Sequence, residues 1–154
     1  MNQLLKVIYK RIFGDSFTYS NFDARIKLQK AVYLLENMGV TIGEYSFHWD
    51  TYGPYSLNLD YEASQLGEME PENYVFSKYA ENSFDRLKSI AEQQTKYDVT
   101  TWMECVASLH YLRNVLRFED EKAILELRSR KAHMDKEESN RAALYIANTI
   151  KVGA

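Results

Sequence analysis

The most apolar stretch of the chain is predicted to be a helix over residues 24–38. At about 100° per residue, its apolar side chains gather on one broad face, which we expect to be core: Ala24, Leu28, Ala31, Val32, Leu34, Leu35 and Met38. Ile26 and Tyr33 form a second, narrower apolar strip, with polar residues between the two. A helix that is apolar on two sides is packed on two sides. The pattern therefore predicts a central helix.

Six further stretches repeat apolar residues at helical spacing. They cover residues 2–13, 57–66, 84–91, 101–112, 119–133 and 135–150. Residues that commonly cap helices stand before four of the seven predicted helices: Ser20 or Asn21, Ser56, Thr101 with Glu104, and Asp135 with Glu138. The sequence thus predicts about seven helices.

Two short stretches are typical of strands. Residues 45–49 alternate apolar and polar side chains, as a half-buried strand does, and residues 74–76 favour β-structure. We expect these two stretches to pair. Residues 52–55, Tyr-Gly-Pro-Tyr, predict a turn, because proline fixes its own φ and disfavours helix at the residue before it. The predicted fold class is mainly α (α+β), with about seven helices and a small two-stranded β element.

Composition and length favour one compact domain. The chain has 154 residues, of which 45% are hydrophobic. We expect a single domain over 1–154, with a helix, strand and turn in residues 21–66 and a helical part in residues 100–151. The single cysteine, Cys105, excludes an internal disulfide and fits a buried thiol. With no signal-peptide pattern and no apolar run of eighteen residues, the expected location is the cytoplasm, with no membrane partner.

Charge and aromatic content bear on the kind of partner. The formal net charge is −3, and residues 56–98 carry four basic and nine acidic side chains, which we interpret as a solvated surface. Because no stretch is strongly basic, nucleic acid is a possible but disfavoured partner. Twelve tyrosines suit a protein-binding surface, the edge of a core, or stacking on single-stranded nucleic acid. A DNA-binding, winged-helix-like regulator is one alternative function.

Few residues are candidates for catalysis. His48 and Asp50 share one face of the first predicted strand, and a histidine beside a carboxylate can act as an acid or base, so an unrecognised hydrolase is a second alternative. The favoured interpretation of His48 is a surface histidine. His110 and His133 lack partners at metal-site spacing. The sequence therefore predicts no enzyme, no metal and no cofactor.

One arrangement of residues supports a family resemblance. Lys27-Leu-Gln-Lys30 and Tyr33-Leu-Leu35 are followed by the aromatic strand and by residues 52–56, Tyr-Gly-Pro-Tyr-Ser. This order resembles the small bacterial and phage proteins of the YwgA-like type and, more distantly, the Panacea antitoxin domain. The resemblance covers about residues 25–66, and the tail over residues 102–150 is similar to the YwgA-like proteins only. The Panacea resemblance implies binding and neutralisation of a toxin, whereas the YwgA-like resemblance implies no particular activity.

The residues that match the family pattern are Leu28, Gln29, Lys30, Tyr33, Gly53 and Pro54. Leu28 is expected in the core and Gly53-Pro54 in the turn, whereas Gln29 and Lys30 either tie the helix to the turn or contact a partner. The functional prediction is a non-catalytic protein-interaction module, antitoxin-like or related to phage defence, whose partner is another protein such as a toxin. Its predicted binding surface contains Gln29, Lys30, Tyr33, Tyr52 and Tyr55.

Overall fold

A computed structural model describes residues 2–151 of the chain. Within this range the fold has seven helices and one two-stranded antiparallel sheet, which confirms the predicted mainly α class. In chain order the elements are α1 (Leu4–Phe13), α2 (Phe22–Asn37), β1 (His48–Asp50), β2 (Gly53–Tyr55), α3 (Leu57–Ser64), α4 (Lys78–Ala91), α5 (Val99–Asn114), α6 (Asp120–Arg130) and α7 (Glu137–Thr149).

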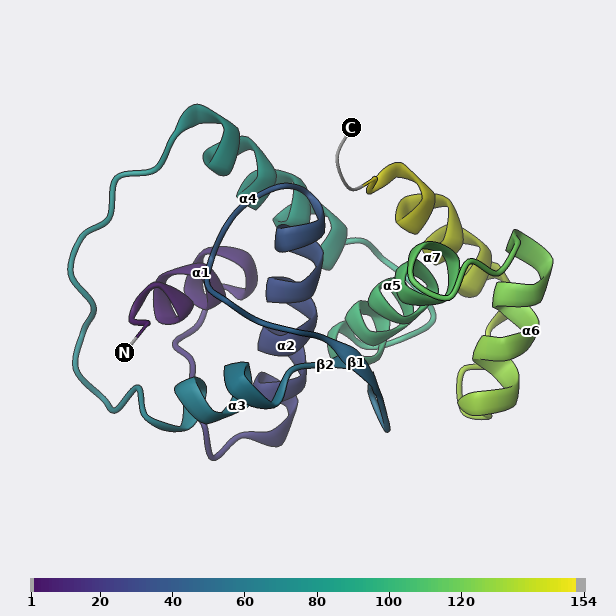
Figure 1. The fold of residues 1–154 in the computed structure, drawn as a ribbon, viewed down its shortest axis with the longest axis horizontal. Coiled ribbons are helices and arrows are strands. Elements are labelled where there is room, and N and C mark those ends of the chain that lie inside the picture. Colours follow the sequence, from purple (N-terminus) through teal and green to yellow (C-terminus); the bar gives the residue numbers. More distant parts are fainter. Residues whose placement is uncertain (1, 152–154) are drawn as a thin grey trace.

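Helix α2 lies in the middle of the molecule. In Figure 1 it stands between α1 and α4 on one side and α5, α6 and α7 on the other, with α3 and the β-hairpin beneath. Both of its predicted apolar strips are buried, including Leu28 and Leu35 on the broad face and Ile26 and Tyr33 on the narrow one. The two-sided pattern therefore predicted correctly that α2 is packed on two sides.

Two of the predicted helix caps are confirmed and two are wrong. Asn21 accepts a hydrogen bond from the Ala24 N–H at the start of α2, and Ser56 accepts one from the Leu59 N–H at the start of α3. The cap of α5 is Asp98 rather than Thr101, because the Asp98 carboxylate accepts the Thr101 N–H at 2.8 Å and the helix begins earlier.

Helix α7 likewise begins at Glu137, after Lys136, rather than with Asp135 as its cap. The Lys136 N–H donates to the Tyr97 hydroxyl, which itself donates to Asn140 on α7. The start of this helix is thus fixed by Tyr97 from the loop between α4 and α5, about forty positions earlier in the chain, which no local capping pattern predicts.

The predicted strand pairing is wrong. β1 pairs with β2, in the register His48 with Tyr55, Trp49 with Pro54 and Asp50 with Gly53. The predicted turn thus supplies the second strand, because Gly53 has a φ of +90° that allows the chain to return after only two connecting residues. Residues 74–76 form no strand, and Phe76 packs on Phe84 of α4 instead.

Two further expectations concern burial. Cys105 is buried, and burial raises the pKa of its thiol, so it is an inert core residue. Within residues 2–151, none of the helices has the length and apolarity required to cross a bilayer.

The packing of α2 leads to a prediction about stability. We expect Leu35→Asp to abolish cooperative folding, because Leu35 is fully buried and the new carboxylate would have no partner. The expected destabilisation is about 4–5 kcal/mol or more, a large part of the stability of an ordinary domain. The matched control is Leu125→Asp on α6, where the leucine is 68% exposed and little change is expected. Thermal unfolding followed by circular dichroism measures both variants, and a cooperative melt of Leu35→Asp near the wild-type temperature would contradict the prediction.

Candidate functional site

Helix α2 holds the β-hairpin through two polar side chains that bind the backbone at the end of the hairpin. The Gln29 amide makes two hydrogen bonds with the backbone of Ser56, donating from Nε2 to the carbonyl and accepting the N–H at Oε1, each at 2.9 Å. Lys30 donates from Nζ to the Pro54 carbonyl at 2.7 Å. The polar ends of Gln29 and Lys30 thereby fix the end of β2 and the start of α3.

A second lysine reaches the same hairpin from the other side. Lys131, directly after α6, donates from Nζ to the Thr51 carbonyl and forms an ion pair with Glu104 of α5, with Nζ and Oε2 2.8 Å apart. Lys30, Lys131 and Glu104 are all buried, and we call them the buried lysine clamp. Because its two lysines bind carbonyls on both sides of residues 52–53, the clamp fixes the tip of the hairpin.

The clamp perturbs the protonation of Lys30. Burial lowers the pKa of Lys30 from its ordinary 10.5 to about 7, because desolvation disfavours the charged form. The negative charge of Glu104 opposes this shift, and the positive charge of Lys131 adds to it. The clamp therefore contains two lysine amino groups and one carboxylate, and the carbonyls of Pro54 and Thr51 supply further acceptors, which also accept from a neutral amine.

Tyr33 belongs to another buried polar contact. Its hydroxyl lies 2.7 Å from His110 Nδ1, and His110 Nε2 lies 2.7 Å from the Ile150 carbonyl. Because a carbonyl only accepts, Nε2 carries a proton, and in the neutral imidazole Nδ1 then accepts from the Tyr33 hydroxyl. Burial lowers the pKa of His110 and raises that of Tyr33, which keeps both groups uncharged. The contact joins α2, α5 and the end of α7.

Gln29, Lys30 and Tyr33 do not lie on an accessible surface, and the alternative that Gln29 and Lys30 tie the helix to the turn matches their hydrogen bonds. All three side chains are buried, and Lys30 is only 1% exposed. The helical wheel places Gln29 and Lys30 at the border of the core face, but the hairpin and α5 cover that border and their polar atoms bind backbone carbonyls there. These residues position the hairpin instead of contacting a partner directly.

Two predicted site residues remain accessible. Tyr52, at the tip of the hairpin, is 39% exposed, and Tyr55 is partly exposed on β2. The Tyr52 ring packs edge to face on Phe22, with ring centroids 5.2 Å apart, and Phe22 is itself 49% exposed. The three aromatic rings come from two segments that the sequence separates by thirty residues.

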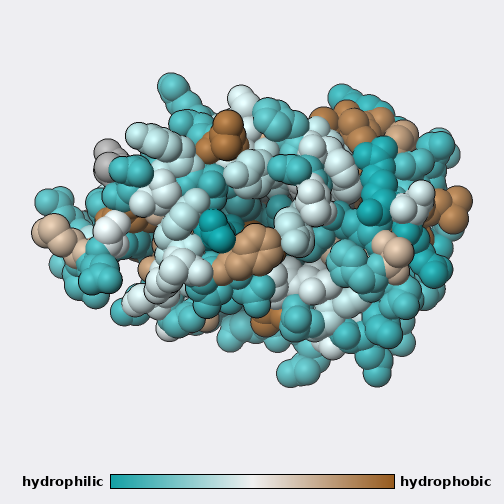
Figure 2. Space-filling view, turned by 90° about the horizontal axis from the view of Figure 1, so that it is seen from below, coloured by the Kyte–Doolittle hydropathy of each residue, from teal (hydrophilic) through white to brown (hydrophobic). Residues whose placement is uncertain are grey.

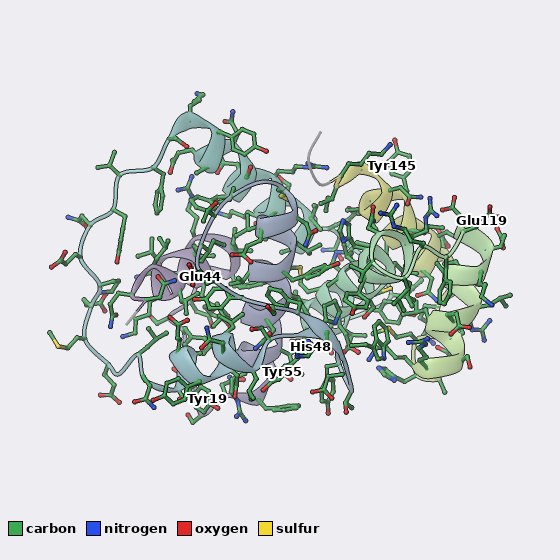
Figure 3. All side chains as sticks on the ribbon, viewed as in Figure 1. Tyr19, Glu44, His48, Tyr55, Glu119 and Tyr145 are labelled. Carbon is green, nitrogen blue, oxygen red and sulfur yellow. The ribbon has the colours of Figure 1, made fainter. Side chains whose placement is uncertain are left out.

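Arg25 and Tyr19 complete the same surface. The Arg25 guanidinium lies 4.6 Å from the Tyr19 ring centroid and 5.4 Å from that of Phe22. We call these five accessible residues the aromatic face: Tyr19, Phe22, Arg25, Tyr52 and Tyr55. Seen from below the view of Figure 1, the middle of the molecule carries hydrophobic and weakly polar side chains between hydrophilic ones (Figure 2). Figure 3 shows Tyr55 between Tyr19 and His48 along this lower side.

Asp60 of α3 connects two tyrosines of the aromatic face. The Tyr19 hydroxyl donates to Asp60 Oδ2 at 3.1 Å. Partial burial raises the pKa of Tyr55, and the nearby charge of Asp60 raises it further. Asp60 thus restrains the ring of Tyr19, and its carboxylate lies close enough to Tyr55 to affect its ionisation.

The sequence analysis missed Tyr19, Phe22 and Arg25 as surface residues. The spacing of Phe22 and Arg25 at i and i+3 in the first turn of a helix predicts that the ring and the guanidinium are neighbours. That spacing is local and can be seen in the sequence alone. The contact of Phe22 with Tyr52, by contrast, depends on where the hairpin packs.

His48 and Asp50, the pair expected in a hydrolase, lie on the same short strand but do not form a hydrogen-bonded pair in the described residues. His48 and Asp50 are both exposed on β1, and within residues 2–151 no hydrogen bond joins their side chains. Asp50 Oδ1 instead accepts the Thr51 N–H at 2.7 Å. The described residues contain no group of three or more histidine, cysteine or acidic side chains placed to hold a metal ion.

A large groove borders the aromatic face at Tyr19. It has a volume of about 950 Å³ and runs between α1 and the segment over residues 67–76. Its walls carry charges of both signs, from Lys6 and Lys10 on α1 and from Glu68, Glu70 and Glu72 on the segment. Lys6 donates to the Met69 carbonyl across one end. Within residues 2–151, no hydrogen bond joins a serine or threonine hydroxyl of the groove to a carboxylate or a histidine.

The buried lysine clamp leads to a prediction about pH. The pKa of Lys30 is near 10.5 in the unfolded chain and about 7 in the folded one, so between these values the unfolded chain binds more protons and stability rises with pH. Below about pH 7 both states are protonated and the contribution is constant. From pH 7 to pH 9 we expect Lys30 to add about 2 kcal/mol to the free energy of unfolding.

Comparison with Lys30→Met isolates this contribution, because methionine does not titrate. Urea unfolding at several pH values should show a shallower rise for this variant, and Lys88→Met, at an exposed position on α4, is the control. Parallel curves for the wild type and Lys30→Met would show that Lys30 stays protonated in the folded protein.

His48 leads to a prediction of little change. We expect His48→Ala to alter the free energy of unfolding by no more than about 0.5 kcal/mol, because its side chain is exposed and makes no hydrogen bond within the described residues. Chemical denaturation measures the effect. Loss of a hydrolytic activity in this variant would favour the hydrolase alternative.

Comparison with known proteins adds no further assignment. No family model, curated protein or solved structure matches the chain. The resemblance to the YwgA-like proteins and to the Panacea domain therefore rests on the matching residues in α2 and the hairpin, and it stays a prediction.

Proposed function

We propose that the protein is a non-catalytic protein-interaction module that binds its partner through the aromatic face. The observation that carries this proposal is the exposed contact between Phe22 and Tyr52, held at a hairpin tip whose carbonyls are bound from beneath by Lys30 and Lys131. Exposed rings on a rigid support are the type of group that dominates binding energy at protein interfaces.

Rigidity is the main physical support for the proposal. Binding is opposed by the conformational entropy that side chains and loops lose when they are immobilised. In this hairpin the carbonyls of Thr51 and Pro54 are already bound, and Gln29 holds Ser56 by two hydrogen bonds. Tyr52 and Tyr55 therefore start from restricted positions, and a partner gains more of the contact energy.

The composition of the aromatic face also favours a protein partner. Tyrosine, phenylalanine and arginine are enriched at interface cores, since all three bury a large area and tyrosine and arginine also carry a polar end. All five residues of the aromatic face belong to these three types. The resemblance to the Panacea domain adds the expectation that the partner is a toxin, and we include this antitoxin-like role in the proposal.

The test combines a double substitution with a measured affinity. The protein is used to capture its partner from the native host, and titration calorimetry then compares the wild type with Phe22→Ala/Tyr52→Ala. We expect a loss of at least about 2 kcal/mol, roughly thirtyfold in Kd, because both rings of the exposed pair are removed.

Tyr145→Ala is the matched control, because Tyr145 is 75% exposed on α7 and lies on another side of the molecule from Tyr19 and Tyr55 (Figure 3). Circular dichroism checks that both variants are folded. An unchanged affinity in a folded double mutant would show that the partner binds elsewhere.

A further inference from the structure

Arg25 is held by aromatic rings but has no polar partner. Its guanidinium lies over the rings of Tyr19 and Phe22, at 4.6 and 5.4 Å from their centroids. Among residues 2–151, no hydrogen bond or ion pair joins this guanidinium to another side chain or to the backbone, and its Nε is buried without an acceptor. The N–H groups of Arg25 are therefore unmatched by any acceptor in the described part of the chain.

The surroundings of Arg25 restrict its orientation. The Tyr19 hydroxyl is bound to Asp60, which holds the ring on which the guanidinium rests. A planar guanidinium that is stacked on a ring has less rotational freedom to lose when it binds. Its free edge presents two parallel N–H donors, the arrangement that matches the two oxygens of a carboxylate.

We propose that Arg25 binds a carboxylate of the partner, so that the aromatic face recognises a protein segment with an acidic side chain among apolar ones. This inference rests on the proposed function and specifies the chemistry of the partner. Tyr52 and Phe22 would contact the apolar residues of the segment, and Arg25 would form a bidentate ion pair with its Asp or Glu. Both kinds of contact lie on one surface, since Phe22 touches both Tyr52 and Arg25.

Charge favours a single carboxylate over a nucleic-acid backbone. Asp23 and Asp50 are exposed on the elements that carry the aromatic face, and the partly exposed Asp60 lies beside Tyr19. A chain of phosphates along this surface would meet several carboxylates and one guanidinium. One acidic side chain, in contrast, can pair with Arg25 while neutral or basic neighbours of the partner lie near the aspartates.

The experiment uses a display library of random twelve-residue peptides selected on the full chain. We expect enriched peptides to carry an Asp or Glu next to aromatic or aliphatic residues. One such peptide is synthesised with a fluorescent label, together with its Asn or Gln analogue, and fluorescence anisotropy measures the affinity of both. The proteins compared are the wild type, Arg25→Gln, Arg25→Lys and the control Arg128→Gln at an exposed position on α6.

We expect Arg25→Gln to weaken binding of the acidic peptide at least tenfold. Arg25→Lys should weaken it less, because lysine keeps the positive charge but cannot bind both carboxylate oxygens through parallel N–H donors. Neither substitution should matter for the amide analogue, so the double-mutant cycle shows coupling between Arg25 and the peptide carboxylate. Circular dichroism verifies the fold of each variant, and Arg25→Lys serves as the second variant if Arg25→Gln is unfolded.

The outcomes separate the two proposals. Peptides whose binding depends on Phe22 and Tyr52 but not on Arg25 would overturn this inference and leave the proposed function standing. If no enriched peptide is sensitive to Phe22→Ala/Tyr52→Ala, the proposed function fails and this inference fails with it. A labelled single-stranded oligonucleotide is measured in parallel, and binding that requires Arg25 would overturn the choice of a carboxylate.

Discussion

The burial of two lysine amino groups beside the β-hairpin is the constraint on which the arrangement of this protein depends. A polar group removed from water, and a charged one most of all, is unfavourable unless polar groups of the protein replace its hydration. Lys30 obtains a carbonyl from Pro54, and Lys131 obtains a carbonyl from Thr51 and the carboxylate of Glu104. Displacement of the hairpin would deprive both lysines of an acceptor, so the tip of the hairpin is held in one position.

The same helix connects this constraint to the accessible surface. Phe22, Arg25 and Gln29 follow one another at spacings of three and four residues, which places them along one side of α2. The first two contribute to the aromatic face, and the third binds the backbone where β2 passes into α3. Because α2 is packed on two sides, the surface is carried in part by a central element of the fold.

The hairpin also explains why its glycine is needed. Gly53 has a positive φ, and a Cβ at this position would collide with Ser108 Oγ of α5. The tip of the hairpin thus lies directly on α5, one turn after Glu104 of the clamp. Backbone conformation and close packing both require glycine here. Gly53 and Pro54 can therefore begin β2 while it lies against α5.

The sequence by itself determined the helices, because helical periodicity and capping are encoded within a few neighbouring residues. It predicted the two-sided burial of α2 and the caps Asn21 and Ser56, and the predicted alternation matches the half-burial of Phe47, directly before β1, and of Trp49 within it. Only the tertiary structure decided what lies over Lys30. That answer depends on Glu104 and Lys131, which are more than seventy residues from Lys30 in the chain and invisible to any local pattern. For this reason the sequence left open whether Gln29 and Lys30 tie the helix to the turn or contact a partner, whereas long-range packing buried both side chains and left Phe22 and Arg25 accessible beside Tyr52.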